Sequence, residues 1–227
     1  MINGFDHTNL KHIENKKKEC KRYDIHWKKI TPQGVLHNHF KKFIDISKQL
    51  PNKIGNKLIE IGVGFGGFSY TAQKSGFDVT CTTLGEMSDV EKKSWELLNL
   101  NPVYFKMGQN SFSELLKDGI KPNIIYSCGV PFNRDFSVKN NIDPFDDYWF
   151  DEISYWFPII DDVFVNLSDG GFFFSNHNYH LNQSLTNDLI VKMKTKYGPK
   201  CDLLFNCYAM TLENKKVPVT NMFIVKK

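Results

Sequence analysis

The sequence has no long apolar run, whereas a membrane-spanning helix needs about 20 consecutive apolar residues. Its first residues contain no apolar stretch of the kind that a secretory signal requires. The five cysteines are scattered singly, with no CxxC pair, which argues against a disulfide framework and against a zinc knuckle. Internal repeats are also absent. We therefore expect a cytoplasmic protein that makes no contact with a membrane.

Arginine is scarce as well, because only Arg22 and Arg134 occur among the 29 basic residues. The remaining composition is ordinary: 227 residues, 41% of them hydrophobic and 24% charged, are enough to bury one large core. The charge is uneven, since residues 1–50 hold 11 Lys and Arg against 5 Asp and Glu. Such a segment can meet phosphates, and it can equally be the solvated face of a helix. We expect residues 1–50 to form a basic helical N-terminal extension or lid, ahead of one domain at 51–227.

From residue 57 onward, short apolar runs alternate with helix-like stretches, which predicts a mostly parallel sheet covered by helices. The expected strands are 57–61, 78–83, 102–107, 123–127 and 171–175, and the expected helices are 66–75, 88–100, 111–118, 146–167 and 182–197. Two further strands, 202–210 and 217–225, are separated by too few residues for a helix. They must therefore pair antiparallel, as a hairpin at the end of the sheet.

A glycine cluster directly follows the first of these strands. Glu60, Gly62, Gly64 and Gly66 form an acid-x-Gly-x-Gly-x-Gly pattern that opens the next helix. Glycines at such a place allow a tight turn, close approach of a ligand to the backbone, and close packing of helix on strand. Packing alone is a sufficient reason for Gly66.

This motif and the terminal hairpin resemble the class I S-adenosylmethionine-dependent methyltransferases, over roughly residues 55–227. The resemblance implies an α/β fold with a Rossmann-like, mostly parallel seven-stranded sheet, helices on both faces and an antiparallel last strand. It also implies an enzyme that uses S-adenosyl-L-methionine as cofactor. In this family the glycine loop passes under the methionine part of the cofactor, and Glu60 would position its ammonium group directly or through water.

The sequence departs from the family pattern at two places. The second strand ends in Thr83, where the family usually has an acid for the ribose hydroxyls, and this form looks like the cyclopropane-fatty-acid-synthase branch. Glu86 is our candidate for the ribose, with Thr83 assisting. After the third strand, the usual Gly-Asp is replaced by Gly-Gln, so we expect Gln109 and Asn110 to hydrogen-bond the adenine.

The acceptor is expected beyond the carboxyl ends of the fourth and fifth strands, where parallel sheets bind their ligands. Cys128 directly follows the fourth strand, at the rim of the cofactor site, and an inert thiol is favoured there. A hydroxyl acceptor needs a base, for which His177 and His180 are candidates, with His177 nearer the strand end. Both are also compatible with a solvated or structural role. Arg134 would bind an acidic group of the substrate, or else pair with Asp135.

The acidic and aromatic stretch at 143–152 leaves two readings open. Some sugar O-methyltransferases bind magnesium with carboxylates near the acceptor, but acids at a helix N-terminus need no metal, and we expect none here. The aromatics Tyr148, Trp149, Tyr155 and Trp156 would line a pocket or belong to the core.

The favoured function is methyl transfer to a small polar acceptor, with a hydroxyl preferred. One alternative is an RNA or protein methyltransferase that uses the basic N-terminal arm as a tether. Another is a non-catalytic cofactor-binding module on the same fold. Nucleic acid is the less favoured partner, because we find no appended nucleic-acid module and the loop after the fifth strand contains plausible bases. The absence of an Asn-Pro-Pro-Tyr-type motif after the fourth strand argues against an amino-methylating DNA enzyme. The oligomeric state does not follow from the sequence.

Overall fold

The computed structural model describes residues 55–64, 66–74, 76–83, 85, 89–128, 153–177, 183–210 and 216–227. These residues form helices and a seven-stranded mixed sheet that is mostly parallel, so the predicted α/β fold class is confirmed. The chain divides into two compact units, one ending at Lys106 and the other beginning at Met107. Each unit contributes its own strands and helices.

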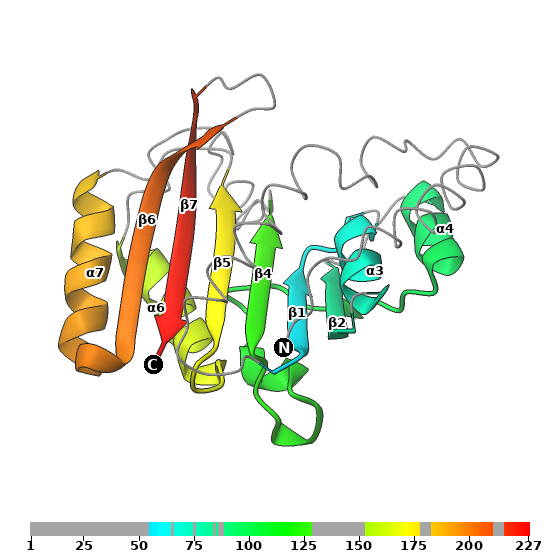
Figure 1. Ribbon diagram of the computed structural model, residues 1–227, viewed down its shortest axis with the longest axis horizontal. Helices are drawn as coiled ribbons and strands as arrows, with labels where there is room; N and C mark the ends of the chain where they lie inside the picture. Colours follow the sequence, from blue (N-terminus) through cyan, green and yellow to red (C-terminus); the bar gives the residue numbers. More distant parts are fainter. Residues whose placement is uncertain are drawn as a thin grey trace. The chain divides into compact units, whose positions relative to one another are not determined.

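The described residues of the N-terminal unit form three parallel strands and two helices (Figure 1). In chain order they are β1 (Lys57–Ile61), α3 (Gly67–Lys74), β2 (Asp78–Thr83), α4 (Asp89–Leu98) and β3 (Val103–Tyr104). The strand order is β3-β2-β1, with Glu60 opposite Cys81 and Thr83 opposite Tyr104. Because the strands are parallel, their carboxyl ends lie at one edge of this part of the sheet.

The core of this unit is apolar on both sides of its first strand. Leu58, Ile59 and Ile61 of β1 are all buried, as is typical of a parallel strand with both faces covered. A neighbouring buried cluster consists of Val63, Tyr70, Cys81, Leu98 and Leu100, with Val79, Trp95 and Leu97 packed against it. This cluster packs Val63, which follows β1, against Leu98 and Leu100 at the end of α4.

In the C-terminal unit, the described residues form four strands, two α-helices and three short 3-10 turns. In chain order they are η2 (Phe112–Leu115), η3 (Lys117–Gly119), β4 (Ile124–Cys128), α6 (Ile153–Asn166), β5 (Phe172–His177), α7 (Gln183–Tyr197), η5 (Gly198–Lys200), β6 (Cys201–Met210) and β7 (Lys216–Lys226). The strand order is β4-β5-β7-β6. β4 and β5 are parallel, whereas β7 is antiparallel to both β5 and β6. The predicted terminal hairpin is therefore confirmed.

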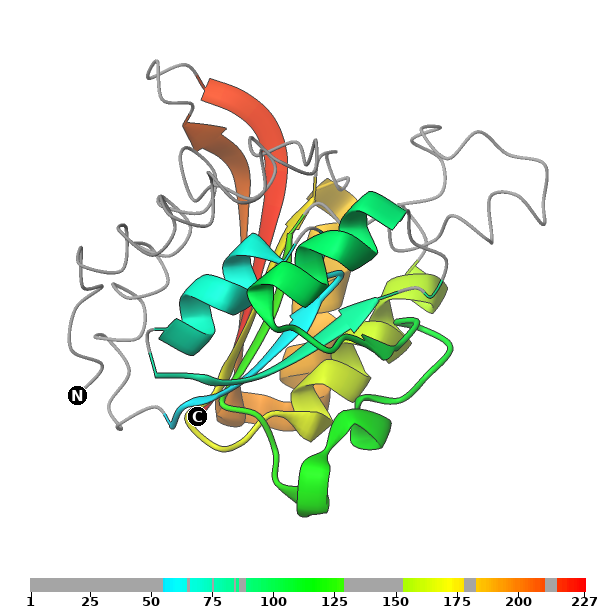
Figure 2. The same cartoon turned by 90° about the vertical axis from the view of Figure 1, so that its right-hand side faces the viewer.

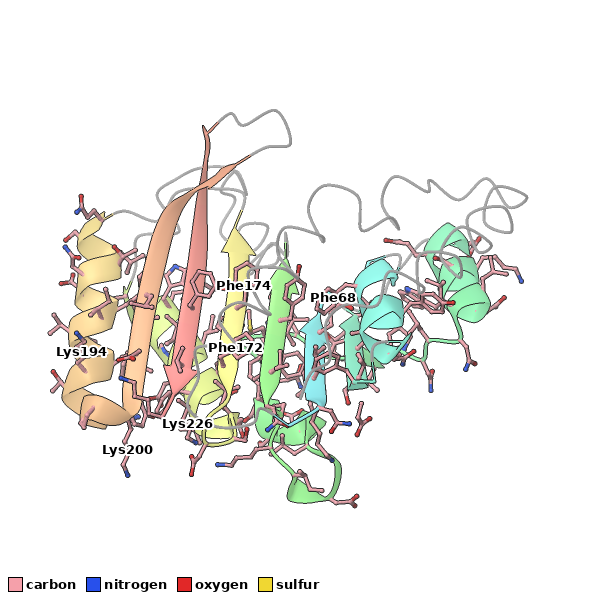
Figure 3. All side chains as sticks on the ribbon, in the orientation of Figure 1. Phe68, Phe172, Phe174, Lys194, Lys200 and Lys226 are labelled. Carbon is pink, nitrogen blue, oxygen red and sulfur yellow. The ribbon has the colours of Figure 1, made fainter. Side chains whose placement is uncertain are left out.

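Two helices of this unit lie side by side on the same side of the strands (Figure 2). Asp161 of α6 joins them, because its carboxylate accepts from Lys196 Nζ at 2.7 Å and from the Tyr197 hydroxyl at 2.5 Å. Phe172 and Phe174 of β5 are two residues apart, so they share one face of the strand (Figure 3). Their backbone neighbours on β4 and β5 are buried on both faces, so these strands carry the core of the unit.

Two predicted elements are wrong in this unit and just before it. The strand expected at 102–107 has only two residues, Val103–Tyr104, and the helix expected at 111–118 is a pair of 3-10 turns. Asp118 and Gly119 have φ values of +55° and +69°. An α-helix cannot continue through that left-handed backbone.

The other predicted elements agree closely with the structure. Every other strand, and the helices expected at 66–75, 88–100 and 182–197, have ends within two residues of the prediction. The helix expected at 146–167 is described over Ile153–Asn166, with Pro158 inside it. Residues 1–50 lie outside the described residues, so the N-terminal extension stays a prediction.

Candidate functional site

The loop between β1 and α3 contains two glycines that serve different purposes. The φ values of Gly64 and Gly66 are +49° and +88°, a backbone region that favours glycine. A Cβ built on Gly66 would overlap Leu100 Cδ1 and lie 3.2 Å from Leu98 Cδ1. A Cβ on Gly64 would meet no atom within 4 Å in the described part of the chain. Gly66 therefore permits close packing, as the alternative reading held, while Gly64 leaves open space beside the loop.

Side chains from β2 and α4 hold this loop in place. The Gly62 N–H donates to Thr82 Oγ1 at 3.2 Å, and the Val63 N–H donates to the Thr82 carbonyl at 2.8 Å. From α4, the Trp95 indole N–H donates to the Gly64 carbonyl at 2.7 Å. No short sequence motif indicates partners that lie 20 to 31 positions along the chain. Neither Thr82 nor Trp95 was therefore predicted as part of the site.

Glu60 lies one residue before the end of β1, and its side chain is buried with 5% exposure. Its carboxylate accepts hydrogen bonds from the hydroxyl and the backbone N–H of Ser69, in the first turn of α3. Burial raises the pKa of Glu60 from 4.5 to about 8, although the Ser69 hydrogen bonds act in the opposite direction. The predicted cofactor acid is thus also the group that caps the helix after the glycine loop.

At the end of β2, Thr83 shapes the turn that follows. Its side chain is buried, and its Oγ1 accepts from the Gly85 N–H at 3.4 Å. The Tyr104 ring lies against Gly85, with Cδ2 3.1 Å from the position that a Cβ would take there, and Tyr104 is 59% exposed. Glu86, the other residue predicted to bind the ribose, lies outside the described residues.

In the C-terminal unit, the two residues predicted to bind adenine differ in their surroundings. Gln109 is exposed. Asn110 is partly buried, and its amide donates to Glu114 Oε2 at 2.9 Å. Glu114 also closes a capping box with Ser111, whose hydroxyl donates to Asp162 Oδ1 of α6 at 2.8 Å. The Ser-x-x-Glu spacing is a sequence signal for this cap, whereas Asp162 has no comparable signal.

The carboxyl ends of β4 and β5 bring four predicted or neighbouring residues into register. Ser127 is opposite Ser175, Cys128 is opposite Asn176, and His177 is the last residue of β5. Ser127 is fully buried, and its hydroxyl has no hydrogen-bond partner in the part of the chain that the structure describes. The backbone position of His177 at the strand end agrees with the prediction.

Several predicted site residues cannot be placed. Arg134 and His180 lie outside the described residues, as does the acidic stretch at 143–152. Of the aromatics near it, Trp156 is fully buried and belongs to the core, and Tyr155 packs edge-on against it. Burial raises the pKa of the Tyr155 hydroxyl.

Neither a metal site nor a membrane-spanning helix is found in the described ranges. Within them, no group of three or more His, Cys, Asp or Glu side chains is arranged to bind a metal ion. Among the same residues, none of the helices has the length and apolar character needed to cross a bilayer.

A glycine loop after the first parallel strand, together with a last strand inserted antiparallel in a terminal hairpin, defines the fold of the class I S-adenosylmethionine-dependent methyltransferases. No protein-family model matches the sequence, and no curated protein matches it either. The similarity is therefore one of structure.

Three solved structures illustrate this similarity. The plantazolicin methyltransferase BpumL, in complex with S-adenosylhomocysteine, has a TM-score of 0.54 at 9% identity, over 99% of this chain and 91% of that one. Cofactor-bound Rv0187 from MTB has a TM-score of 0.50 at 8% identity, over 99% and 92%. A SAM-dependent methyltransferase from Streptococcus mutans has a TM-score of 0.50 at 13% identity, over 80% of this chain. The match spans about half of that protein's length, 48%.

Proposed function

We propose that this protein is an S-adenosylmethionine-dependent methyltransferase that acts on a small polar acceptor, with a hydroxyl favoured. The observation that carries the proposal is the open space beside Gly64, in the loop after β1 of this fold. Surface turns such as the one at Gly198 are equally open, so the weight of the observation comes from the place of Gly64, directly after β1 at the carboxyl end of a parallel strand. Backbone without a side chain, in a left-handed conformation, lets a ligand come close to the chain.

The residues that would hold the cofactor are assigned by their positions along the fold. Gly62, Gly64 and Gly66 form the loop, and Glu60 supplies a carboxyl for the ammonium group of the methionine part. Thr83 and Glu86 would hydrogen-bond the ribose, and Gln109 and Asn110 the adenine. Cys128 would lie at the rim of the cofactor site. When bound, S-adenosylmethionine supplies a methyl group activated on a sulfonium. Because the Asn110 amide already donates to Glu114, Gln109 is the stronger candidate for the adenine.

Glu60 has a property that suits binding of a cation. Its buried carboxyl has a pKa of about 8, so near neutral pH it exchanges between its two protonation states. A nearby ammonium group favours the ionised carboxylate. Binding of the cofactor would therefore draw a proton off Glu60 and strengthen the contact.

For the acceptor, the task of the protein is to align a nucleophile and to take up its proton. His177 ends β5 beside the end of β4, where an acceptor would lie. We assign it the role of general base, with His180 as the second candidate and Arg134 as the partner of an acidic substrate group. An imidazole titrates near neutral pH and can accept a hydroxyl proton there.

A second candidate function is methylation of RNA or protein, favoured by the excess of basic residues in positions 1–50. The described lysines give this candidate little support. Lys200 and Lys226 lie at the end of the C-terminal unit opposite the carboxyl ends of β4 and β5 (Figure 3). They would not guide a polyanion to the acceptor side.

The test is to measure binding of S-adenosylmethionine and S-adenosylhomocysteine by calorimetry and thermal shift, then turnover. We expect both compounds to bind and to raise the unfolding midpoint. Turnover with isotope-labelled cofactor and a mixture of small polar metabolites is then expected to label one of them. RNA binding that persists at moderate salt would favour the second candidate. Binding of neither compound would overturn the proposal, and binding without turnover on any acceptor would favour a non-catalytic module.

A further inference from the structure

We propose that Trp95 is a positioning residue for the cofactor, because its indole N–H holds the Gly64 peptide in the conformation that the cofactor meets. This inference rests on the proposed function. It concerns a residue of α4 that lies outside the glycine motif and has no counterpart among the motif positions. In this proposal Trp95 does not contact the cofactor and acts only through Gly64.

Trp95 touches the glycine loop at two points. Its Nε1 donates to the Gly64 carbonyl oxygen at 2.7 Å, within the normal range for a good hydrogen bond. Its Cδ1 lies 3.6 Å from the position that a Cβ would take on Gly66. The rest of the ring packs, partly buried, against the cluster of Val63, Tyr70, Cys81, Leu98 and Leu100. The indole therefore holds Gly64 by its N–H, and the adjacent ring carbon lies near Gly66.

Hydrogen bonds and packing restrain both ends of the loop, whereas Gly64 in its middle has no packing contact on its Cβ side among the described residues. A hydrogen bond to Gly64 therefore supplies a restraint that packing does not. At the first end, Gly62 and Val63 donate to Thr82 of β2. At the other end, Gly66 N–H donates back to the Val63 carbonyl at 2.8 Å, and Gly66 packs on Leu100. Gly64 lies between them with open space on the side where a Cβ would stand. Packing on that side cannot restrain it.

A glycine peptide without restraint samples many conformations, and a ligand that selects one of them loses affinity in proportion. The hydrogen bond from Trp95 removes much of that freedom before the cofactor arrives. A hydrogen bond of this kind is worth a net factor of about threefold to tenfold in an equilibrium constant. We therefore expect the loss of the indole donor to weaken cofactor binding by about that factor.

The variant Trp95→Phe keeps an aromatic ring in the cluster and removes the donor. The matched control is Leu97→Ala, because Leu97 is also on α4 and packs against the same cluster, but it is not among the side chains nearest to Gly66. Binding of S-adenosylhomocysteine is measured by calorimetry, and stability by urea unfolding. We expect the Kd to rise threefold to tenfold in Trp95→Phe and to stay unchanged in Leu97→Ala, even where Leu97→Ala is the less stable protein. In turnover, the KM for S-adenosylmethionine should rise in Trp95→Phe with kcat unchanged, because the bond is the same in the ground and transition states.

A spectroscopic measurement separates positioning from packing. In protein with 15N-labelled tryptophan, the Trp95 indole signal is identified by its loss in Trp95→Phe, and it should shift on addition of S-adenosylhomocysteine. Should Trp95→Phe leave a cavity, a benzothienylalanine at position 95 keeps the shape of the indole and lacks only its N–H donor. It should weaken binding as Trp95→Phe does.

An unchanged Kd in both donor-less variants would overturn the role of Trp95 while leaving the proposed function intact. The same conclusion follows if the Kd tracks stability equally in Leu97→Ala and Trp95→Phe. Absence of binding to the unmodified protein would instead overturn the proposed function, and the role of Trp95 with it.

Discussion

Ser69 donates its hydroxyl hydrogen to the carboxylate of Glu60, and both side chains are buried where β1 leads into α3. The pair spans the glycine loop, since one partner precedes the loop and the other follows it. A carboxylate at the first turn of a helix also interacts favourably with the exposed backbone N–H groups there. The same group therefore fixes the ends of the loop and places a titratable acid beside it.

Replacement of Glu60 by Gln should change how stability depends on pH. The pKa of Glu60 is 4.5 in its ordinary state and about 8 when folded. Its contribution to stability is therefore complete below pH 4.5 and is lost as the pH rises toward 8. Relative to Glu60→Gln, the unmodified protein should lose at most about 1.4 kcal/mol per pH unit between pH 5 and 8. Urea unfolding at four pH values measures this.

The control for that series is Glu96→Gln, because the Glu96 side chain is 65% exposed and pairs only with Lys93 at the surface. Its stability curve should run parallel to that of the unmodified protein. A Glu60→Gln curve that is also parallel would show that Glu60 does not titrate in this range.

Gly64→Asp should abolish cofactor binding and leave the fold intact. Asp tolerates left-handed backbone better than most residues, and a Cβ on Gly64 meets no atom of the described residues within 4 Å. The carboxylate would then fill the space that the proposed ligand needs. The matched control is Gly198→Asp, where φ is +58° and the surrounding space is equally open. Calorimetry should detect binding only in the control, and similar unfolding midpoints are expected for both variants. Full affinity in Gly64→Asp would refute the assignment of the loop.

Asp162→Ala should destabilise the C-terminal unit by about 2–3 kcal/mol, because charge-assisted hydrogen bonds are the stronger kind. Its carboxylate accepts from the Ser111 hydroxyl and from the Phe112 N–H, each at 2.8 Å. For comparison, Asp169 is 87% exposed and lies 3.6 Å from Lys226, so Asp169→Ala should change stability by less than about 1 kcal/mol. Chemical unfolding of both variants decides the point. Equal effects would mean that Asp162 does not hold the turn after Asn110.

His177→Ala should lower turnover by about 100-fold or more if His177 is the general base, since positioned bases contribute about 10²–10⁴ in rate. Binding of S-adenosylhomocysteine should be retained, because the assigned base serves the acceptor. His180→Ala is measured in parallel by the same single-turnover assay. Unchanged turnover in His177→Ala with a loss in His180→Ala would move the role to His180.

Most of the fold could be predicted from the sequence because its signals are local. Short runs rich in apolar or β-branched residues, such as Lys57–Ile61 and Asp78–Thr83, end at turn residues and have the length of buried strands. The terminal hairpin follows from chain length alone, because too few residues separate its strands for a parallel crossover. The glycine loop was also visible, as a pattern within seven residues.

The parts that escaped prediction depend on contacts between distant residues or on single backbone conformations. Trp95 and Gly64 are 31 positions apart, and Ser111 and Asp162 are 51 apart. The spacing of apolar residues at 111–118 suits a helix, yet Leu116 is already extended, with φ −77° and ψ 109°, and Asp118 adopts a left-handed conformation after it. The role of Gly66 in packing also depends on Leu100, which only the tertiary structure brings beside it.

The position of β7 between β5 and β6 has a consequence for biosynthesis. While the ribosome is still adding residues 216–226, β5 has no partner on one side and β6 has none at all. Folding of this half of the sheet must therefore wait until those residues leave the exit tunnel. A nascent chain that stalls before Lys216 would present two unpaired edges to chaperones, and a premature stop codon there would leave an aggregation-prone fragment.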